Sequence, residues 1–410
     1  MSERNPRGSA GALRVLQLVP DALPTFRVDV SVLFGKYLPR YGVQCDVVGK
    51  TSDAPLLDQG FSSVRRAPTG KKWRVELSYL WLYIRTIFKA RREECNVIQV
   101  RDMVTHGLIG LLCAKLKRVP FVYWMSYLMS ESRIDRARTS LRNGGGLRAR
   151  MVLLKGLVEY SLLYKVVLRF ADHVFVQTDT MLDRVEQKGI PRSKMTPVPM
   201  GVDMEAVMAR PEPRRPEGWD AGPLLAYLGT LDPVRQIDLI IDALVLIRQV
   251  QPDARLLLIG DASTKADAQR LLDHAAKVGV GDAVRITGWL PIQEAWQLLM
   301  GADAAVSYIP RGPILDTGSP TKVLEYMALG IPSLGNDNPD QRVIMLESDA
   351  GWLTDSTPAG MADAAIRIFA DPQSAARRAA AGPGYIEAKR SYRVLGEMVA
   401  QRYKVLVAQQ

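Results

Sequence analysis

The chain of 410 residues is 47% hydrophobic and 24% charged, which is the composition of an ordinary globular protein and excludes an intrinsically disordered one. Its length allows two domains of roughly 100–200 residues each. The three cysteines are odd in number and form no Cys-x-x-Cys pair, so the sequence favours a reducing compartment over a disulfide framework or a zinc site. No uninterrupted apolar run reaches about 18 residues, so we expect no transmembrane helix and a cytoplasmic location.

The net charge of +11 is unevenly distributed along the chain. Residues 60–170 contain 22 Lys and Arg against 7 Asp and Glu, which gives this segment a net charge of +15. Residues 171–410 carry a net charge of −5. A localised basic surface attracts anionic lipid, nucleic acid or polyphosphate, although a solvated face without a partner is the simpler interpretation.

The first half of the chain alternates short apolar runs with helical patterns, which predicts a parallel sheet built from βαβ units. Strands are expected at 14–19, 45–48, 97–100, 121–124 and 173–176, and a helix at 28–41. A helical stripe of large apolar residues between Trp73 and Phe88 is flanked by lysines and arginines, so it either faces the core or lies at a membrane surface. Residues 151–168 predict a long, mostly buried helix, which follows a glycine-rich loop at 143–146.

A proline-rich, charged segment at 210–216 lacks periodicity and is typical of an interdomain linker. A second βαβ series follows, with strands expected at 224–228, 255–259, 284–287 and 304–308 and helices at 237–249 and 322–329. We therefore divide the α/β chain into an N-terminal Rossmann-like domain (1–208), a linker (209–222), a second Rossmann-like domain (223–390) and a C-terminal helix (391–410).

The first of two chemically informative segments is 227–235, which runs from a strand into a loop. Ligands of open parallel sheets bind beside the carboxyl ends of the strands. Gly229 would let the backbone approach a phosphate closely, and the forked guanidinium of Arg235 would neutralise it. Taken alone, the glycine is more simply explained as part of a turn.

The second segment, 316–332, places Ser319 before a helix that is expected to begin near Pro320. The Ser319 hydroxyl would cap this helix, and its free amides and dipole would favour an anion. Lys322 adds a positive charge in the first turn, which is unfavourable for the helix and indicates an anionic ligand. Glu325 follows one turn later, where a carboxylate can accept hydrogen bonds from the hydroxyls of a ribose. The simpler alternative makes Ser319 a cap and leaves the two charged residues as solvated surface groups.

The segments Gly229-Thr-Leu…Arg235 and Ser319-Pro-Thr-Lys…Glu325 resemble those of the retaining glycosyltransferases of the GT-B fold, family 4, in particular those that build bacterial surface polysaccharides. The resemblance covers about residues 12–390 and is supported by runs at 171–178, 198–203, 257–260 and 286–290. It implies two Rossmann-like domains that face a cleft, with a final helix at about 392–407 that crosses back to the N-terminal domain. It also implies hexosyl transfer from a UDP- or GDP-sugar with retention of configuration, without a cofactor or an obligatory metal.

In this resemblance Arg235 and Lys322 are the catalytic residues that hold the donor diphosphate, and no metal site is expected. The implied donor-binding residues are Gly229, Thr230, Gly288, Leu290, Ser319, Pro320, Thr321 and Glu325. For acceptor contact in the N-terminal domain we select Arg101, Asp102, His106, Ser126 and Glu131. The sequence departs from the family pattern at three places: Thr317 replaces a glutamate, Ser126 replaces a histidine, and 20–24 replaces a glycine-rich loop.

The expected acceptor is a lipid-linked diphosphate glycan of surface polysaccharide or glycolipid biosynthesis. Residues 60–170 would contact the anionic inner face of the cell membrane peripherally. Two alternatives remain at this point. One is a nucleotide-sugar epimerase of the same fold, and the other is a non-catalytic basic protein that binds nucleic acid or membrane and carries a degenerate sugar site. Nucleic acid is not the expected partner, because the sequence contains no recognised nucleic-acid module.

Overall fold

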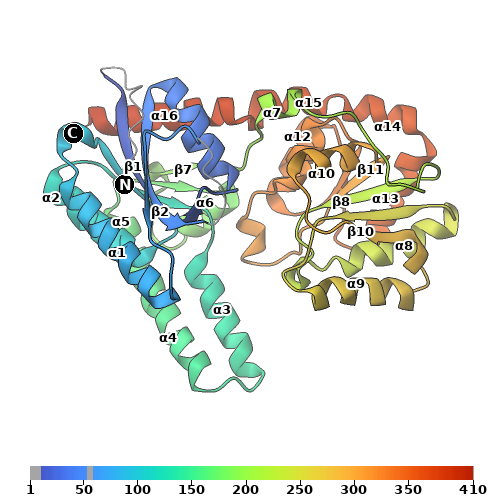
Figure 1. The fold of residues 1–410 in the computed structure, drawn as a ribbon, viewed down its shortest axis with the longest axis horizontal. Coiled ribbons are helices and arrows are strands. Elements are labelled where there is room, and N and C mark those ends of the chain that lie inside the picture. The colour runs from blue at the N-terminus through green and yellow to red at the C-terminus, as the bar shows by residue number, and fades with distance from the viewer. Residues whose placement is uncertain (1–10, 53–58, 410) are drawn as a thin grey trace. The chain divides into compact units, whose positions relative to one another are not determined.

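The computed structural model describes residues 11–52 and 59–409 and divides into two compact α/β units (Figure 1). Unit 1 comprises Met1–Pro199 and Tyr392–Gln410, and unit 2 comprises Met200–Ser391. The division falls at Pro199 rather than at a linker over 209–222, because that segment packs within unit 2. There the guanidinium of Arg215 pairs with Asp303 (Nη2–Oδ2, 2.6 Å) and donates a hydrogen bond to the carbonyl of Gly222.

Within the described residues, unit 1 contains a seven-stranded sheet in the order β3-β2-β1-β4-β5-β6-β7, and neighbouring strands are parallel. The strands are β1 (Leu13–Leu23), β2 (Val43–Thr51), β3 (Ser63–Ala67), β4 (Val97–Arg101), β5 (Phe121–Met125), β6 (His173–Val176) and β7 (Met195–Pro197). The five strands predicted in this half are confirmed. The two that the sequence analysis missed, β3 and β7, are the short edge strands.

The helices of unit 1 alternate with these strands (Figure 1). They are η1 (Asp29–Tyr37), η2 (Leu38–Tyr41), α1 (Lys72–Lys89), η3 (Arg92–Glu94), α2 (Val104–Lys117), α3 (Met129–Arg142), α4 (Leu147–Leu162), η4 (Leu163–Val167), α5 (Leu168–Phe170), α6 (Asp179–Glu186), η5 (Arg192–Lys194) and α16 (Tyr392–Ala408). The labels η1 and η4 denote π-helical turns and the other η labels here denote 3-10 turns. The predicted helix at 28–41 ends as expected at Gly42, whose φ of +77° suits a glycine.

The last helix, α16, completes the core of unit 1, which confirms the expected return of the chain to its first domain. Its apolar residues pack with η1 and with β1, β2, β5 and β6. The hydroxyl of Tyr403 also donates to Oε1 of Gln99 (2.6 Å), and the Gln99 amide donates to Oε1 of Gln17 (2.5 Å). All three side chains are buried, so these hydrogen bonds join α16 to the middle of the sheet.

The segment 151–168 was predicted as a mostly buried helix, and this is wrong for α4. One face of α4 packs on α3, where Gly156 allows the backbone to approach Ile134. Its other face exposes large apolar side chains, including Leu147, Met151 and Leu154, each at least 64% exposed. The apolar composition of the segment predicted a helix, but it does not show which apolar side chains are covered.

In the described part of unit 2, a six-stranded parallel sheet has the order β10-β9-β8-β11-β12-β13. The strands are β8 (Leu224–Leu228), β9 (Arg255–Ile259), β10 (Val284–Ile286), β11 (Ala304–Ser307), β12 (Ser333–Asn336) and β13 (Trp352–Thr354). Alternate residues of β8 enter two different cores, one on each face of the sheet, as expected for a strand that is covered on both sides.

Helices cover both faces of this second sheet (Figure 1). They are α7 (Met204–Met208), η6 (Pro233–Arg235), α8 (Asp238–Val250), α9 (Lys265–Lys277), η7 (Gly281–Ala283), α10 (Ile292–Met300), η8 (Leu315–Thr317), α11 (Lys322–Ala328), α12 (Pro339–Ser348), α13 (Pro358–Ala370), α14 (Pro372–Ala379), α15 (Gly382–Tyr385) and η9 (Ile386–Arg390). Among the helices of the described residues, none is both long enough and apolar enough to cross a bilayer.

Candidate donor and acceptor sites

The candidate donor site of unit 2 lies where β8 and β11 diverge, at the carboxyl ends of the strands. This is the switch point of the sheet, and open α/β sheets bind their ligands at such a point. Gly229, Gly260 and Gly288 follow three adjacent strands, and all have a positive φ. A Cβ on Gly260 would lie 2.1 Å from the carbonyl oxygen of Gly229. The glycines therefore keep the strand ends close together and leave the backbone uncovered.

Lys322 begins α11 and points to this strand end. Its Nζ lies 5.3 Å from the centre of the Tyr227 ring, and a Cβ on Gly229 would lie 2.5 Å from its Cε. Burial lowers the pKa of Lys322 to about 8, and the neighbouring positive charge of Arg235 acts in the same direction. Two neighbouring positive charges repel each other, and a bound polyanion would neutralise both.

Glu325 lies one turn after Lys322 on the same face of α11. Burial raises the pKa of its carboxyl to about 7, while the Trp296 indole and Lys322 act in the opposite direction. The site thus holds a carboxylate and an ammonium group that are both costly to charge in a buried setting. Perturbed groups of this kind concentrate at functional sites.

Ser319 does not cap α11, contrary to the prediction. The helix begins at Lys322, which agrees with the expected range 322–329 but is later than a start near Pro320, and its N-cap residue Thr321 makes no side-chain cap. Ser319 instead donates to Oδ2 of Asp340 (2.6 Å) and accepts from the backbone amide of Met200 (3.0 Å). Ser319 therefore joins the loop before α11 to Asp340 of α12 and to the backbone of Met200.

The remaining predicted donor residues lie in the connections that follow β8 and β10 and that precede α11. The carbonyl of Thr230 accepts from the Tyr227 hydroxyl (3.2 Å), and the carbonyl of Gly288 accepts from the Thr287 hydroxyl (2.7 Å). Pro320 is buried before α11, and Leu290 is half-buried against one of the cores of unit 2. These residues shape the site through backbone and packing rather than through charge.

Thr317 stands where the family commonly has a glutamate, and its side chain points inward. It is buried, and its hydroxyl donates to the carbonyl of Ile314 (2.7 Å). The adjacent Asp316 is paired with Arg311 (Oδ1–Nε, 2.8 Å), which also pairs with Asp337 (2.8 Å). The carboxylate nearest to the missing glutamate is therefore already bound to a guanidinium.

Three predicted acceptor residues of unit 1 form one buried cluster. Arg101, at the end of β4, pairs with Asp29 (2.6 Å) and Asp21 (3.0 Å) and donates to the Ser126 hydroxyl (3.1 Å). Asp102 accepts from both the backbone amide (2.8 Å) and the hydroxyl of Ser126. Burial raises the pKa of Asp102 despite these partners. Only 1% of the Arg101 side chain and 7% of the Asp102 side chain are exposed. These two side chains therefore cannot contact an acceptor directly, and their role is to hold neighbouring groups in place.

The other two predicted acceptor residues lie on helices. His106 of α2 packs against the rings of Tyr79 (5.1 Å) and Tyr83 (4.8 Å) of α1, and burial lowers its pKa to about 4. Glu131 of α3 accepts a hydrogen bond from the Tyr164 hydroxyl. His106 is thus neutral near pH 7 and holds α2 against α1.

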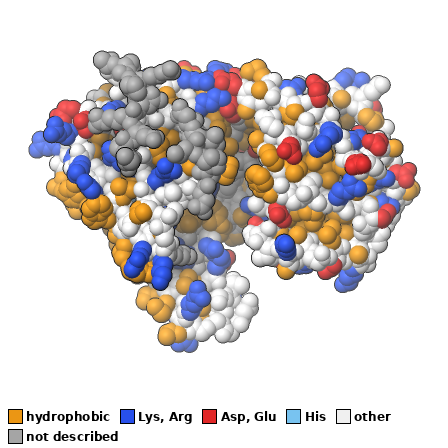
Figure 2. Space-filling view, viewed as in Figure 1, with side chains coloured by type: hydrophobic (Ala, Val, Ile, Leu, Met, Phe, Trp, Pro, Cys, Tyr) orange, Lys and Arg blue, Asp and Glu red, His pale blue; other side chains and the backbone are white. Residues whose placement is uncertain are grey.

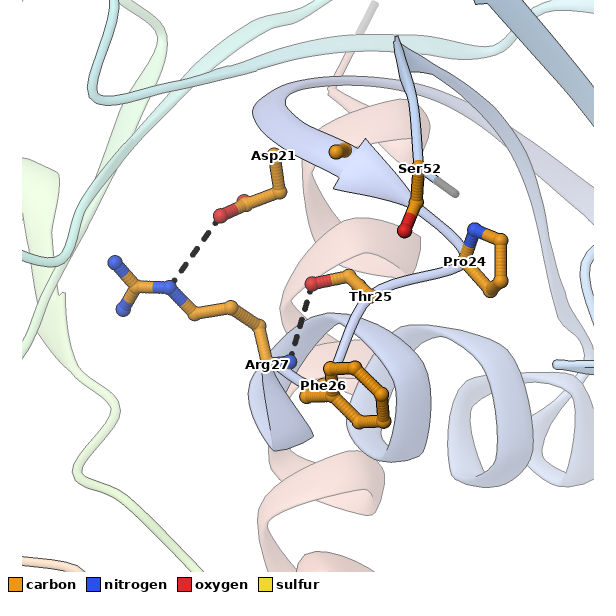
Figure 3. A pocket seen from close by; sticks show the side chains of 7 residues that line it. Asp21, Pro24, Thr25, Phe26, Arg27 and Ser52 are labelled. Carbon is orange, nitrogen blue, oxygen red and sulfur yellow. Dashed lines mark hydrogen bonds and ion pairs between the residues drawn. The ribbon is translucent and has the colours of Figure 1, made fainter. Parts of the chain in front are cut away.

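The accessible groups of unit 1 near the buried cluster were missed by the sequence analysis. They lie at the end of β1, in its connection to η1 and directly after β2, and they line an open pocket of about 410 Å³ (Figure 3). Arg27 pairs with Asp21 (Nε–Oδ1, 3.3 Å), and Phe26 is 79% exposed. Residues 20–24 were noted only for the glycines that they lack. Their position directly after the first strand was the signal that could have identified them.

Two Rossmann-like units, each with polar groups at the switch point of a parallel sheet, are the architecture of the GT-B fold. The structure of Anabaena HepE in complex with UDP has this fold and superposes with a TM-score of 0.70 at 15% identity, covering 96% of this chain and 100% of that one. A family model of glycosyl transferase 4-like domains matches residues 10–201, and one of glycosyl transferases group 1 matches residues 222–371. The chain belongs to the family 4-type glycosyltransferases of the GT-B fold.

Curated relatives match over part of their length. A GDP-mannose-dependent monoacylated alpha-(1-6)-phosphatidylinositol monomannoside mannosyltransferase of Corynebacterium glutamicum is 27% identical over 49% of this chain and 53% of the relative. A GDP-mannose-dependent alpha-(1-6)-phosphatidylinositol monomannoside mannosyltransferase of Mycolicibacterium smegmatis is 27% identical over 52% and 56%, respectively. The chain thus spans about half the length of the curated relatives it matches.

Within the described residues, no three His, Cys, Asp or Glu side chains are arranged to hold a metal ion. The charged groups of the donor site are Arg235, in the connection after β8, and Lys322 and Glu325 of α11, all of which belong to unit 2.

Proposed function

We propose that this protein transfers a hexosyl group from a nucleotide-sugar to a hydroxyl of a glycolipid acceptor, with retention of anomeric configuration. The observation that carries the proposal is the juxtaposition of Lys322, Arg235 and Glu325 around the uncovered backbone of Gly229. The two cations would hold the diphosphate, and Glu325 would accept hydrogen bonds from the ribose hydroxyls. Burial strengthens both interactions because it excludes competing water.

The proposed reaction needs charge stabilisation at the departing diphosphate. As the glycosidic bond breaks, negative charge develops on the leaving phosphate oxygen, next to Lys322 and Arg235. The acceptor hydroxyl would attack from the face that the leaving group departs from, and its proton would pass to the leaving phosphate. Removal of one such cation is expected to lower the turnover number by roughly 10²–10³.

The names of the curated relatives support GDP-mannose as the first donor to test and a phosphatidylinositol mannoside as the first acceptor. The assay follows mannose transfer from labelled GDP-mannose to this glycolipid, and NMR of the product gives the anomeric configuration. Incubation of GDP-mannose without acceptor distinguishes an epimerase, which would convert the sugar. UDP-glucose in parallel tests the nucleotide preference.

Substitution of the two cations tests the donor site directly. Lys322→Ala and Arg235→Ala should each abolish nearly all transfer, whereas Lys277→Ala, which removes an exposed lysine at the end of α9, should not. Wild-type turnover in both site variants would show that the donor site lies elsewhere.

An acceptor in a bilayer requires the enzyme to reach the membrane surface, and helices of unit 1 provide a surface for this. Trp73, Leu77, Trp81 and Phe88 of α1 are between 58% and 62% exposed, and Leu112 and Leu116 of α2 are also exposed. Arg74 and Arg85 lie over the rings of Trp73 and Trp81 at 5.2 Å and 5.0 Å. Figure 2 shows apolar and basic side chains side by side over α1 and α4. Such a surface is typical of helices that lie in the interface of an anionic bilayer.

Vesicle flotation tests this contact. The protein should float with vesicles that contain phosphatidylglycerol and less with pure phosphatidylcholine, and Trp81→Glu should reduce flotation. Leu346→Glu is the matched control, because Leu346 of α12 in unit 2 is also 59% exposed. Equal flotation of both variants would exclude membrane contact through the α1 surface. A dimer found by analytical ultracentrifugation would indicate instead that a second copy of the chain covers this surface.

A further inference from the structure

We propose that the pocket between β1 and η1 of unit 1 binds the polar headgroup of the acceptor, a polyhydroxylated ring that carries a phosphodiester. This inference rests on the proposed function, because it names the acceptor site of the same reaction. The pocket is lined by Asp21, Ala22, Pro24, Thr25, Phe26, Arg27 and Ser52 (Figure 3). Its volume of about 410 Å³ is within the range of small-molecule sites.

The position of the pocket follows from the topology of the sheet. The strand order of unit 1 reverses between β1 and β4, so the carboxyl ends of these two strands flank the switch point. The pocket includes Asp21 and Ala22 at the end of β1, and Arg101 at the end of β4 reaches it through its ion pair with Asp21 (3.0 Å). Open parallel sheets bind ligands in the crevice at such a point.

The walls of the pocket are fixed by hydrogen bonds. The backbone of Thr25 exchanges two bonds with the Gln59 amide, at 2.9 Å and 3.3 Å, and the amide of Ser52 donates to the carbonyl of Leu23 (3.0 Å). Gly49 allows this packing, since a Cβ there would lie 2.7 Å from the carbonyl oxygen of Asp21. The exposed side chains of the pocket are therefore presented on an ordered turn.

Three side chains of different chemistry line the pocket. Phe26 is 79% exposed, so the face of its ring is accessible to an apolar face of a ligand. The carboxylate of Asp21 is held by Arg101 and Arg27 and can accept hydrogen bonds from ring hydroxyls. Arg27 pairs with Asp21 through Nε, and its two terminal nitrogens point away from Asp21 (Figure 3). With 58% of its side chain exposed, Arg27 can bind a phosphate through that edge.

These groups match a ring with an apolar C–H face and a hydroxyl edge, joined to a phosphodiester. The C–H face would pack on Phe26, the hydroxyls would donate to Asp21, and the phosphate would pair with Arg27. A nucleotide base fits less well, because a base offers no run of vicinal hydroxyls to the carboxylate. The headgroup of a phosphoinositide-type glycolipid has all three features.

Calorimetric titration of the full chain with soluble headgroup fragments tests the assignment. Glycerophosphoinositol contains the ring and the phosphodiester, myo-inositol only the ring, and glycerol 3-phosphate only the phosphate. Glycerophosphoinositol should bind more tightly than either fragment. Phe26→Ala should weaken it by roughly tenfold, and Phe26→Trp should retain binding. In the Arg27→Gln variant, glycerophosphoinositol should bind no more tightly than myo-inositol does. In the Arg27→Lys variant, glycerophosphoinositol should still bind somewhat more tightly than myo-inositol.

The controls separate this inference from the proposed function. Phe170→Ala removes another exposed phenyl ring of unit 1, 55% exposed, and should bind glycerophosphoinositol as the wild type does. All variants should bind GDP-mannose unchanged, because the donor site belongs to unit 2. Equal glycerophosphoinositol affinity of wild type, Phe26→Ala and Arg27→Gln would overturn the assignment. So would the absence of glycerophosphoinositol binding in a preparation that binds GDP-mannose, and the donor assignment would then stand.

Discussion

At the scale of single residues, Lys322 combines two properties that oppose each other. Its ammonium group provides the charge that a diphosphate needs, yet burial and Arg235 lower its pKa to about 8. A basic group whose pKa falls on folding is less stable when charged in the native state than in the unfolded chain. The unliganded protein is therefore destabilised by Lys322 at neutral pH, and stability returns as pH rises through about 8 and the proton is lost.

This opposition predicts that Lys322→Met stabilises the unliganded protein and prevents donor binding. Methionine retains the volume of the side chain and removes the buried charge, so we expect a gain of about 1–3 kcal/mol in the free energy of unfolding. Saturating GDP-mannose should raise the Tm of the wild type and leave the Tm of the variant unchanged. Thermal unfolding followed by fluorescence measures both. A variant that is less stable than the wild type and keeps the nucleotide shift would contradict the assigned role.

The pH dependence of donor affinity follows from the same two groups. Glu325, with a pKa of about 7, must lose its proton to accept from ribose hydroxyls, so affinity should fall as pH decreases through that value. Lys322, with a pKa of about 8, must keep its proton, so affinity should also fall as pH increases through that value. The diphosphate diester of GDP-mannose does not titrate in this range. Titration calorimetry across pH 6–9 should give a narrow maximum, with the acid limb absent in Glu325→Gln.

At the scale of elements, the glycine after β8 determines where α11 places its charge. A Cβ on Gly229 would lie 2.5 Å from Lys322 Cε, and the φ of +152° already disfavours an L-residue. We predict that Gly229→Ala lowers the free energy of unfolding by about 1–2 kcal/mol and weakens donor binding by roughly tenfold. Gly279→Ala is the matched control, with a φ of +84° and no atom within 4 Å of its Cβ. Gly279→Ala should lose comparable stability and bind the donor with the affinity of the wild type. Equal donor affinities of the Gly229→Ala and Gly279→Ala variants would disprove that a Cβ at Gly229 displaces Lys322.

In unit 2, β8 to β11 were predicted almost to the residue because they are short and mostly apolar runs, whereas the sequence analysis gave no bounds for β12 and β13. The helices were harder, since periodicity defines an apolar face without saying what covers it. In α1 the core contacts come from Tyr79, Tyr83 and Ile87, whereas Trp73 and Trp81 are exposed. The expected acceptor residue Arg101 was located correctly at a strand end, but its burial among carboxylates from β1 and η1 is a long-range property. No local pattern reports such a contact.

At the scale of the whole molecule, the chain leaves unit 1 at Pro199 and returns to it only at Tyr392. The core of unit 1 is therefore incomplete until the last helix has formed. The hydrogen bond from Tyr403 to Gln99 joins residues 304 positions apart in the sequence. Contacts at such separation form late, because the closure entropy of the intervening chain opposes them.

This connection predicts that Tyr403→Phe destabilises unit 1 and leaves unit 2 unchanged. The variant keeps the ring but leaves Oε1 of Gln99 without its donor in a fully buried site, which costs about 1–3 kcal/mol. Hydrogen exchange should accelerate in β1 and β4 and stay the same in β8 and β9, and the Tm shift caused by GDP-mannose should persist. Tyr41→Phe, which removes the hydroxyl of a half-buried tyrosine of unit 1, should leave exchange in β1 and β4 unchanged. Faster exchange in β8 and β9 of the Tyr403 variant would show instead that α16 stabilises both units together.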